Sequence, residues 1–204
     1  LNAITDGKFH VLDNFHQLHH KKEQKRLRKY FLDELELLLT PIKLDPGHPF
    51  PYLPSLGVGI AVRLRPKPTN REGSAKQHKG ESLYQPSYAV VNIPSNVPRW
   101  LRVDLDADAD ADADAKDADA AGGIAYLPVE QLIISHLGRL FGGWEILDAW
   151  AYRVTRNAEM DWHEEEADDL LEMIAEEVRG RMFAPFVRLE VQTGMPQQLV
   201  DLLT

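Results

Sequence analysis

The chain has 204 residues, 44% hydrophobic and 27% charged, a composition typical of a soluble globular protein with one sizeable domain. It has no cysteine, which excludes disulfides, thiolate nucleophiles and thiolate-bound metals. Eight aspartates and one lysine between Asp104 and Asp119 account for seven of the nine net negative charges, so the remaining chain is nearly neutral. No apolar run approaches the roughly 20 residues of a membrane-spanning helix, and we expect a cytoplasmic protein without a membrane span.

Periodicity predicts one helix and three strands in the first half of the chain. The helix covers residues 22–39 and ends at Pro41. Its predicted apolar side consists of Leu27, Tyr30, Phe31, Leu35 and Leu38. The predicted strands are 57–65, 88–93 and 98–103, with a polar loop after the first and a turn at Pro94-Ser95-Asn96 before the last.

A helix opened by Pro128 is predicted to begin the second half. Its apolar stripe is Leu132, Ile133, Leu137 and Leu140, and Gly142-Gly143 ends it. A β-α-β unit follows. In its first strand Trp150, Tyr152 and Val154 alternate with more polar residues, as in a strand with one packed face.

The helix of that unit is predicted to start at Asp161, with Glu164 at capping-box spacing, and to end at Gly180. A strand over 187–192 and a helix from Pro196 complete the chain. The predicted order is α-β-β-β-α-β-α-β-α. It indicates an α+β fold with a mixed or antiparallel sheet and packed helices.

The Asp-Ala run over 104–121 has two interpretations. Several carboxylates could hold a divalent cation, but the run lacks the glycine and glutamate positions of a calcium-binding loop. As a strand, it would align the carboxylates on one face in mutual repulsion. We therefore expect a disordered, solvated acidic loop.

Arg153 and Arg156 are the candidate anion-binding residues, because they are close together on and just beyond a predicted strand. Structural ion pairs, with Asp148 or Glu159, are the alternative and the favoured interpretation. The helix carrying Lys21, Lys22, Lys25, Arg26, Arg28 and Lys29 could attract a nucleotide or another phosphate-rich anion, but a solvated face is favoured. No aromatic residues interleave with these cations, so nucleic-acid binding is not expected.

No metal site is predicted. His16, His19 and His20 have helical spacing, but no carboxylate or cysteine completes a set, and a solvated surface is favoured. His163 resembles the start of an H-E-x-x-H motif, but Ala167 occupies the last position.

Five groups of short segments carry a family resemblance. In chain order they are Tyr30-Phe31 with Leu39–Ile42, Tyr88–Pro94 with Val97–Trp100, Tyr126–Glu130 with Leu140–Ile146, Tyr152–Glu159, and Val187–Val191 with Met195-Pro196. Together they resemble the middle, or head, domain of the long-chain polyphosphate kinases. The resemblance implies a head domain over 27–204 with the Asp-Ala insertion at 104–121, preceded at 1–26 by the end of another domain or a linker helix.

The resemblance also implies a function for the parent enzyme. Kinases of this family transfer the terminal phosphate of ATP to polyphosphate through a phosphohistidine, with magnesium, and their catalytic domains lie downstream of the head domain. The H-x-K-x4-D pattern of those domains fails here, because Leu27 follows His20 and Lys22 where aspartate is needed. We therefore expect no catalytic residue, metal or cofactor in this chain.

The expected partners are the remaining domains of the same polypeptide, a further copy in a homo-oligomer, and ATP and polyphosphate in the parent enzyme. The first residue, Leu1, and the uncapped helix after Pro196 agree with a fragment. The alternative is a stand-alone, non-enzymatic assembly or interaction module, which explains the missing motifs equally well but not the ordered family-like segments.

Overall fold

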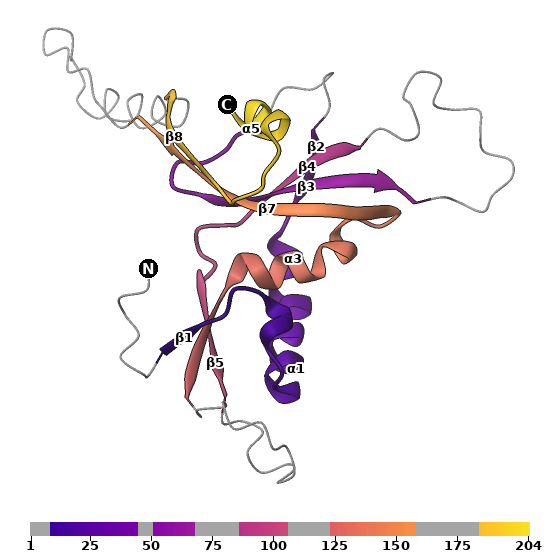
Figure 1. Ribbon diagram of the computed structural model, residues 1–204, viewed down its shortest axis with the longest axis vertical. Helices are drawn as coiled ribbons and strands as arrows, with labels where there is room; N and C mark the ends of the chain where they lie inside the picture. Colours follow the sequence, from indigo (N-terminus) through magenta and orange to yellow (C-terminus); the bar gives the residue numbers. More distant parts are fainter. Residues whose placement is uncertain (1–8, 45–50, 68–85, 106–122, 158–183) are drawn as a thin grey trace, which may run out of the picture.

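The computed structural model describes residues 9–44, 51–67, 86–105, 123–157 and 184–204, which form two sheets and their helices (Figure 1). The α+β fold class predicted from the sequence is confirmed. The larger sheet is antiparallel throughout, with the strand order β2 (Pro41–Leu44), β4 (Ser87–Asn92), β3 (Val58–Pro66), β7 (Trp144–Arg156) and β8 (Phe186–Val191). In the smaller sheet β6 (Ile124–Pro128) lies between β1 (Phe9–Val11), parallel to it, and β5 (Trp100–Asp104), antiparallel to it.

Three short strands were not predicted. They are β1, β2 and β6, of three, four and five residues. Pro41, predicted only to end a helix, also opens β2, and Pro128 closes β6 before it caps the next helix. β7 begins at Trp144, earlier than predicted, because its first half pairs with β3 beyond a register shift at Arg63/Leu64. Asp104, where the predicted insertion begins, is the last residue of β5.

Two predicted features lie outside the described residues. They are the helix from Asp161 to Gly180 and most of the Asp-Ala run. The described helices are η1 (Phe15–Gln17), α1 (Lys21–Tyr30), the π-helical turn η2 (Phe31–Leu35), α2 (Glu36–Leu38), α3 (Val129–Leu140) and α5 (Gln197–Leu203).

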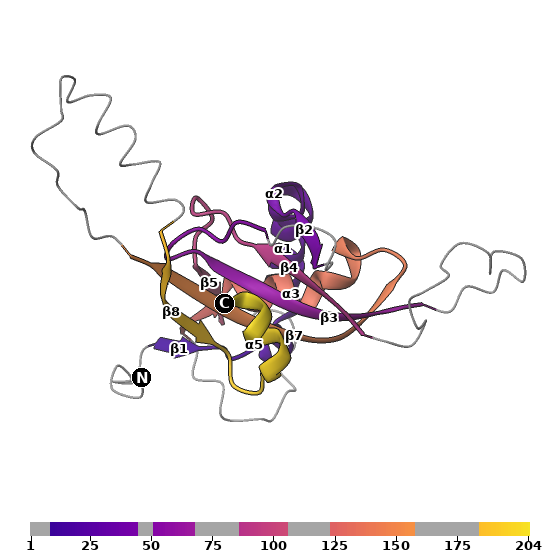
Figure 2. The ribbon, with the colours of Figure 1, turned by 90° about the horizontal axis from the view of Figure 1, so that it is seen from above.

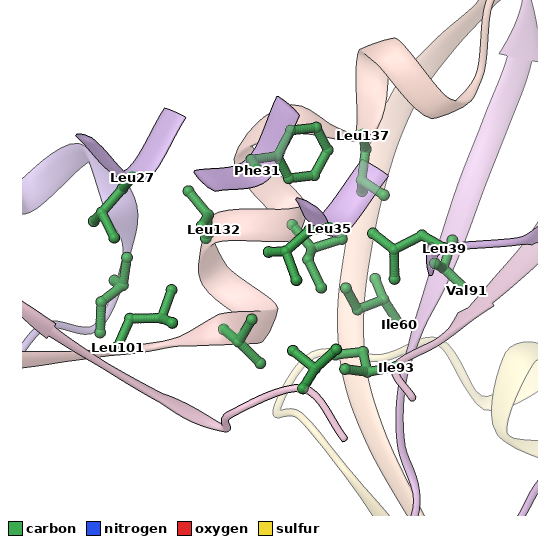
Figure 3. Packing of buried hydrophobic residues seen from close by; sticks show 14 of the residues in the cluster. Leu27, Phe31, Leu35, Leu39, Ile60, Val91, Ile93, Leu101, Leu132 and Leu137 are labelled. Atoms are coloured by element: carbon green, nitrogen blue, oxygen red, sulfur yellow. The ribbon is translucent and has the colours of Figure 1, made fainter. Parts of the chain in front are cut away.

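The larger sheet is covered on both faces. On one face, Ile60 and Val62 of β3 belong to the main core, where α3 contacts β3, β7 and β6 and so connects the two sheets (Figure 3). On the other face, Leu199 and Leu203 of α5 are buried in a second cluster that includes Ala61. Figure 2 shows α5 next to the strands of this sheet. Burial on both sides explains why the first five residues of β3, 58–62, are all apolar.

The helix after His20 buries every fourth residue, namely Glu23, Leu27, Phe31, Leu35 and Leu39. Four residues of α-helix advance about 400°, so this stripe would drift by about 40° at each step. The π-helical turn widens the helix locally and keeps the stripe on the core (Figure 3). The prediction that Leu38 belongs to the apolar side was therefore wrong: Leu39 is buried and Leu38 is exposed.

Close packing joins the central strands at Gly59, which pairs with Tyr152 across β3 and β7. A Cβ atom at Gly59 would lie 2.3 Å from the Cζ atom of the Tyr152 ring. The Tyr152 hydroxyl donates a 2.8 Å hydrogen bond to Oδ1 of Asn92 on β4, and burial raises the pKa of this hydroxyl. The ring thus lies over a glycine and links three adjacent strands.

Glu23 ties α1 to the smaller sheet through a buried carboxylate. It accepts hydrogen bonds from Arg26 Nε and Nη2, at 2.9 and 2.7 Å, and from the Asp104 backbone N–H at 3.2 Å. Arg26 also donates to the Arg102 carbonyl at 2.6 Å. Desolvation opposes ionisation, but these donors and the Arg26 charge outweigh it and lower the pKa of Glu23.

We expect Gly59→Ala to destabilise the fold by about 2 kcal/mol, because the new methyl group displaces the Tyr152 ring from a filled site. Gly138→Ala is the matched control, since nothing lies within 4 Å of a Cβ atom there and alanine favours the interior of α3. It should stabilise by about 0.5–1 kcal/mol. Urea unfolding measures both, and equal effects of the two substitutions would contradict the packing argument.

We expect Glu23→Gln to lower the free energy of unfolding by roughly 2 kcal/mol at pH 7, since charge-assisted hydrogen bonds to a buried group are lost. The folded protein has the lower Glu23 pKa. Its contribution is therefore full above the unfolded-state value of 4.5 and disappears as pH falls through the folded value. When the free energy of unfolding of both proteins is measured between pH 7 and pH 3, the two values should converge as the pH falls. A difference in the free energy of unfolding that does not change with pH would refute the role of the Glu23 charge.

Candidate functional site

The end of β7 carries both arginines singled out in the sequence. Trp150, Tyr152 and Val154 are buried, as their alternation predicts, and Arg153 lies between two of them. Arg153 is directly opposite Glu190 of β8 and donates from Nε to its Oε2 at 2.5 Å. Arg188 reaches the other oxygen of the same carboxylate, with an Nη2–Oε1 distance of 2.9 Å.

A third arginine belongs to this group. The hydrogen bond from Arg153 lowers the pKa of Glu190, and the charges of Arg153, Arg188 and Arg99 add to the effect. Arg99 itself pairs with Glu130 of α3, with an Nη2–Oε1 distance of 2.9 Å. We call Arg99, Arg153 and Arg188 the arginine cluster. With two glutamates among three arginines, it keeps one net positive charge, and all three arginines are solvent-exposed in part.

Arg156 has a different environment. Its Nε donates to the Leu53 carbonyl at 3.0 Å and its Nη1 to the Ala184 carbonyl at 2.6 Å. The guanidinium lies 4.2 Å from the centre of the Phe186 ring, within cation–π range. Arg156 therefore connects the loop before β3 to the start of β8 and has a structural role.

Arg153 forms a structural ion pair, as favoured from the sequence, but Asp148 is not its partner. Asp148 pairs with Arg63, its cross-strand neighbour on β3, and Arg153 pairs with Glu190. In both ion pairs the partners face each other on adjacent strands, because directly opposed side chains are the nearest neighbours in a sheet. Glu159 lies outside the described residues. Anion binding by Arg153 and Arg156 stays a prediction.

A half-open groove of about 620 Å³ lies between α2, the loop before β3 and the start of α3. Leu38, Tyr52 and Leu56 line it together with buried apolar residues and with Arg99 and Glu130 of the adjacent cluster. Sequence analysis did not identify it, because its walls come from four separate segments of the chain.

The histidine and lysine candidates are surface residues. His16 is in η1 and His20 precedes α1, so these histidines do not share one helix despite their helical spacing. Nor do the described residues contain any group of three or more His, Cys, Asp or Glu side chains arranged for a metal ion. The six basic side chains of α1 are exposed, and Arg26 pairs with Glu23. Among the described residues, no helix combines the length and the apolar character needed to cross a membrane.

Comparison with known proteins gives one consistent family. The sequence model described as "Polyphosphate kinase middle domain" matches residues 22–204. A polyphosphate kinase of Mycobacterium avium (strain 104) is 35% identical over 89% of this chain and 22% of its own length. One from Thermosynechococcus vestitus is 33% identical over 98% of this chain and 24% of its own length.

A solved structure shows the same fold. The crystal structure of polyphosphate kinase from Porphyromonas gingivalis matches 96% of this chain with a TM-score of 0.61 at 20% identity, and 23% of that chain is covered. The present chain thus spans about a fifth to a quarter of the length of these relatives. With a family match that covers almost all of its residues, the chain belongs to the polyphosphate kinase middle-domain family.

Proposed function

We propose that the chain is the middle domain of a polyphosphate kinase that transfers the terminal phosphate of ATP to polyphosphate through a phosphohistidine, with magnesium. The observation that carries the proposal is the match over residues 22–204 to enzymes named polyphosphate kinase. Those enzymes are about four times as long as this chain, so the reacting histidine and the ATP and magnesium sites are assigned to the parts outside it. The parent enzyme acts in the cytoplasm.

The domain itself supports the reaction by contributing to oligomer contact and by framing the path of ATP and polyphosphate. The arginine cluster supports the second part, because it keeps a net positive charge on a rigid sheet and exposes guanidinium groups. Arg156 donates to two backbone carbonyls, so within this proposal it positions the strand that carries Arg153.

The assignment of chemistry to other domains predicts an inert fragment. Residues 1–204 incubated with ATP, magnesium and polyphosphate should give no labelled chain growth, whereas the full-length protein should extend the chain. Turnover by the fragment would overturn the assignment. A full-length protein without transfer activity would favour a non-enzymatic assembly module.

The arginine cluster predicts a selective loss of polyphosphate binding. In the full-length protein, Arg188→Gln should weaken polyphosphate binding about fivefold, the effect of losing roughly 1 kcal/mol from an exposed ionic contact. Arg65→Gln is the control, since Arg65 also forms a solvent-exposed ion pair on the larger sheet, with Glu145, but lies outside the arginine cluster. Titration with polyphosphate at two salt concentrations measures the affinity of both variants. Equal losses of affinity would show that the arginine cluster does not contact polyphosphate.

A further inference from the structure

Leu56 combines a left-handed backbone conformation, held by a 2.7 Å hydrogen bond from its N–H to the Val154 carbonyl, with an exposure that its contacts among the described residues do not explain. It lies in a turn closed by a 3.2 Å hydrogen bond from the Gly57 N–H to the Pro54 carbonyl, and its φ angle is +60°. That position normally holds glycine or asparagine, because a Cβ atom disfavours it. The leucine side chain is nevertheless 66% exposed, so it gains little from burial within the domain.

The same leucine lies on the rim of the groove described above. Leu38 and Tyr52 are also exposed and line the groove, and buried Ile93, Val97 and Val129 continue its apolar wall. Exposed apolar side chains gathered around a hollow are typical of a surface that receives a partner.

A buried carboxylate in the groove wall indicates what the partner carries. Glu130 is 6% exposed, and its Oε1 accepts from Arg99 at 2.9 Å. Its Oε2 is buried and finds no hydrogen-bond partner among the described residues. An unpaired buried acceptor is costly, and a cationic donor that enters beside it removes the cost.

We infer that the groove is the docking site for a segment of the same polypeptide outside residues 1–204, which places apolar side chains against Leu56 and a lysine or arginine beside Glu130. The inference rests on the proposed function, in which this chain is a part of a protein about four times as long.

The size of the groove favours a tethered segment over a separate chain. A hollow of about 620 Å³ accommodates a few side chains. A stable contact between separate proteins buries about 1,000 Å² or more. A segment on the same chain needs less contact, because tethering raises its effective concentration to the millimolar range.

Photo-cross-linking in the full-length protein tests the inference. Benzoylphenylalanine replaces Leu56 in one protein and Leu37 in the control, since Leu37 is 82% exposed and does not line the groove. Position 56 should cross-link within the same chain to a peptide outside residues 1–204 that contains lysine or arginine. Cross-links to a second copy, or a yield no higher than at position 37, would overturn the proposal.

Glu130→Gln tests the cationic contact. Glutamine keeps an acceptor for Arg99 but can place an amide donor where Oε2 lies, so the cross-link yield from position 56 should fall about fivefold or more. Thermal unfolding verifies that this variant is folded, and an unchanged yield would exclude the cation.

Leu56→Asp gives an independent measurement, because it alters only an exposed side chain. Hydrogen exchange in the peptide identified by cross-linking should accelerate about fivefold, in line with the loss of a few apolar contacts. Unchanged exchange would refute docking. Neither readout requires turnover, so a failure of the kinase assignment would show separately, as absence of polyphosphate synthesis.

Discussion

The close approach of β3 and β7 at Gly59 is the constraint on which the rest of the domain depends. The Tyr152 ring lies over this glycine and its hydroxyl reaches Asn92 on β4, so one side chain fixes the spacing of three strands. The same strand, β7, places Arg153 opposite Glu190 of β8 and brings Arg156 to the loop before β3. The strand that packs on Gly59 therefore also positions one arginine of the cluster.

Long periodic elements could be predicted from the sequence, whereas three of the short strands could not, although the five-residue β5 was predicted within 98–103. The alternation of Trp150, Tyr152 and Val154 and the stripe of α3 carry enough residues to indicate a period, and the structure has both. β1, β2 and β6 have three to five residues each. They form because neighbouring strands supply hydrogen-bond partners, and these neighbours are known only from the tertiary structure. The π-helical turn is similar, since Leu39 replaces Leu38 in the core through a local change of helical period.

The candidate site shows the same limit. The sequence indicated Arg153 and Arg156 because they are three residues apart, but spacing along a chain does not specify which carboxylate lies across the sheet. Arg99, just before β5, pairs with Glu130 at the start of α3, and strand register places Glu190 opposite Arg153. The groove has no sequence signal beyond Leu56, whose left-handed backbone conformation cannot be recognised from residue type.

A domain without reacting groups can still influence a reaction through the surfaces it holds in place. Here the same helix, α3, contacts both sheets through its apolar side and presents Glu130 in its first turn. One oxygen of Glu130 accepts a hydrogen bond from Arg99 of the arginine cluster, and both residues also line the groove. The other oxygen is buried and has no hydrogen-bond partner among the described residues. The groove and the arginine cluster therefore share one ion pair, and the first turn of α3 helps to position both surfaces.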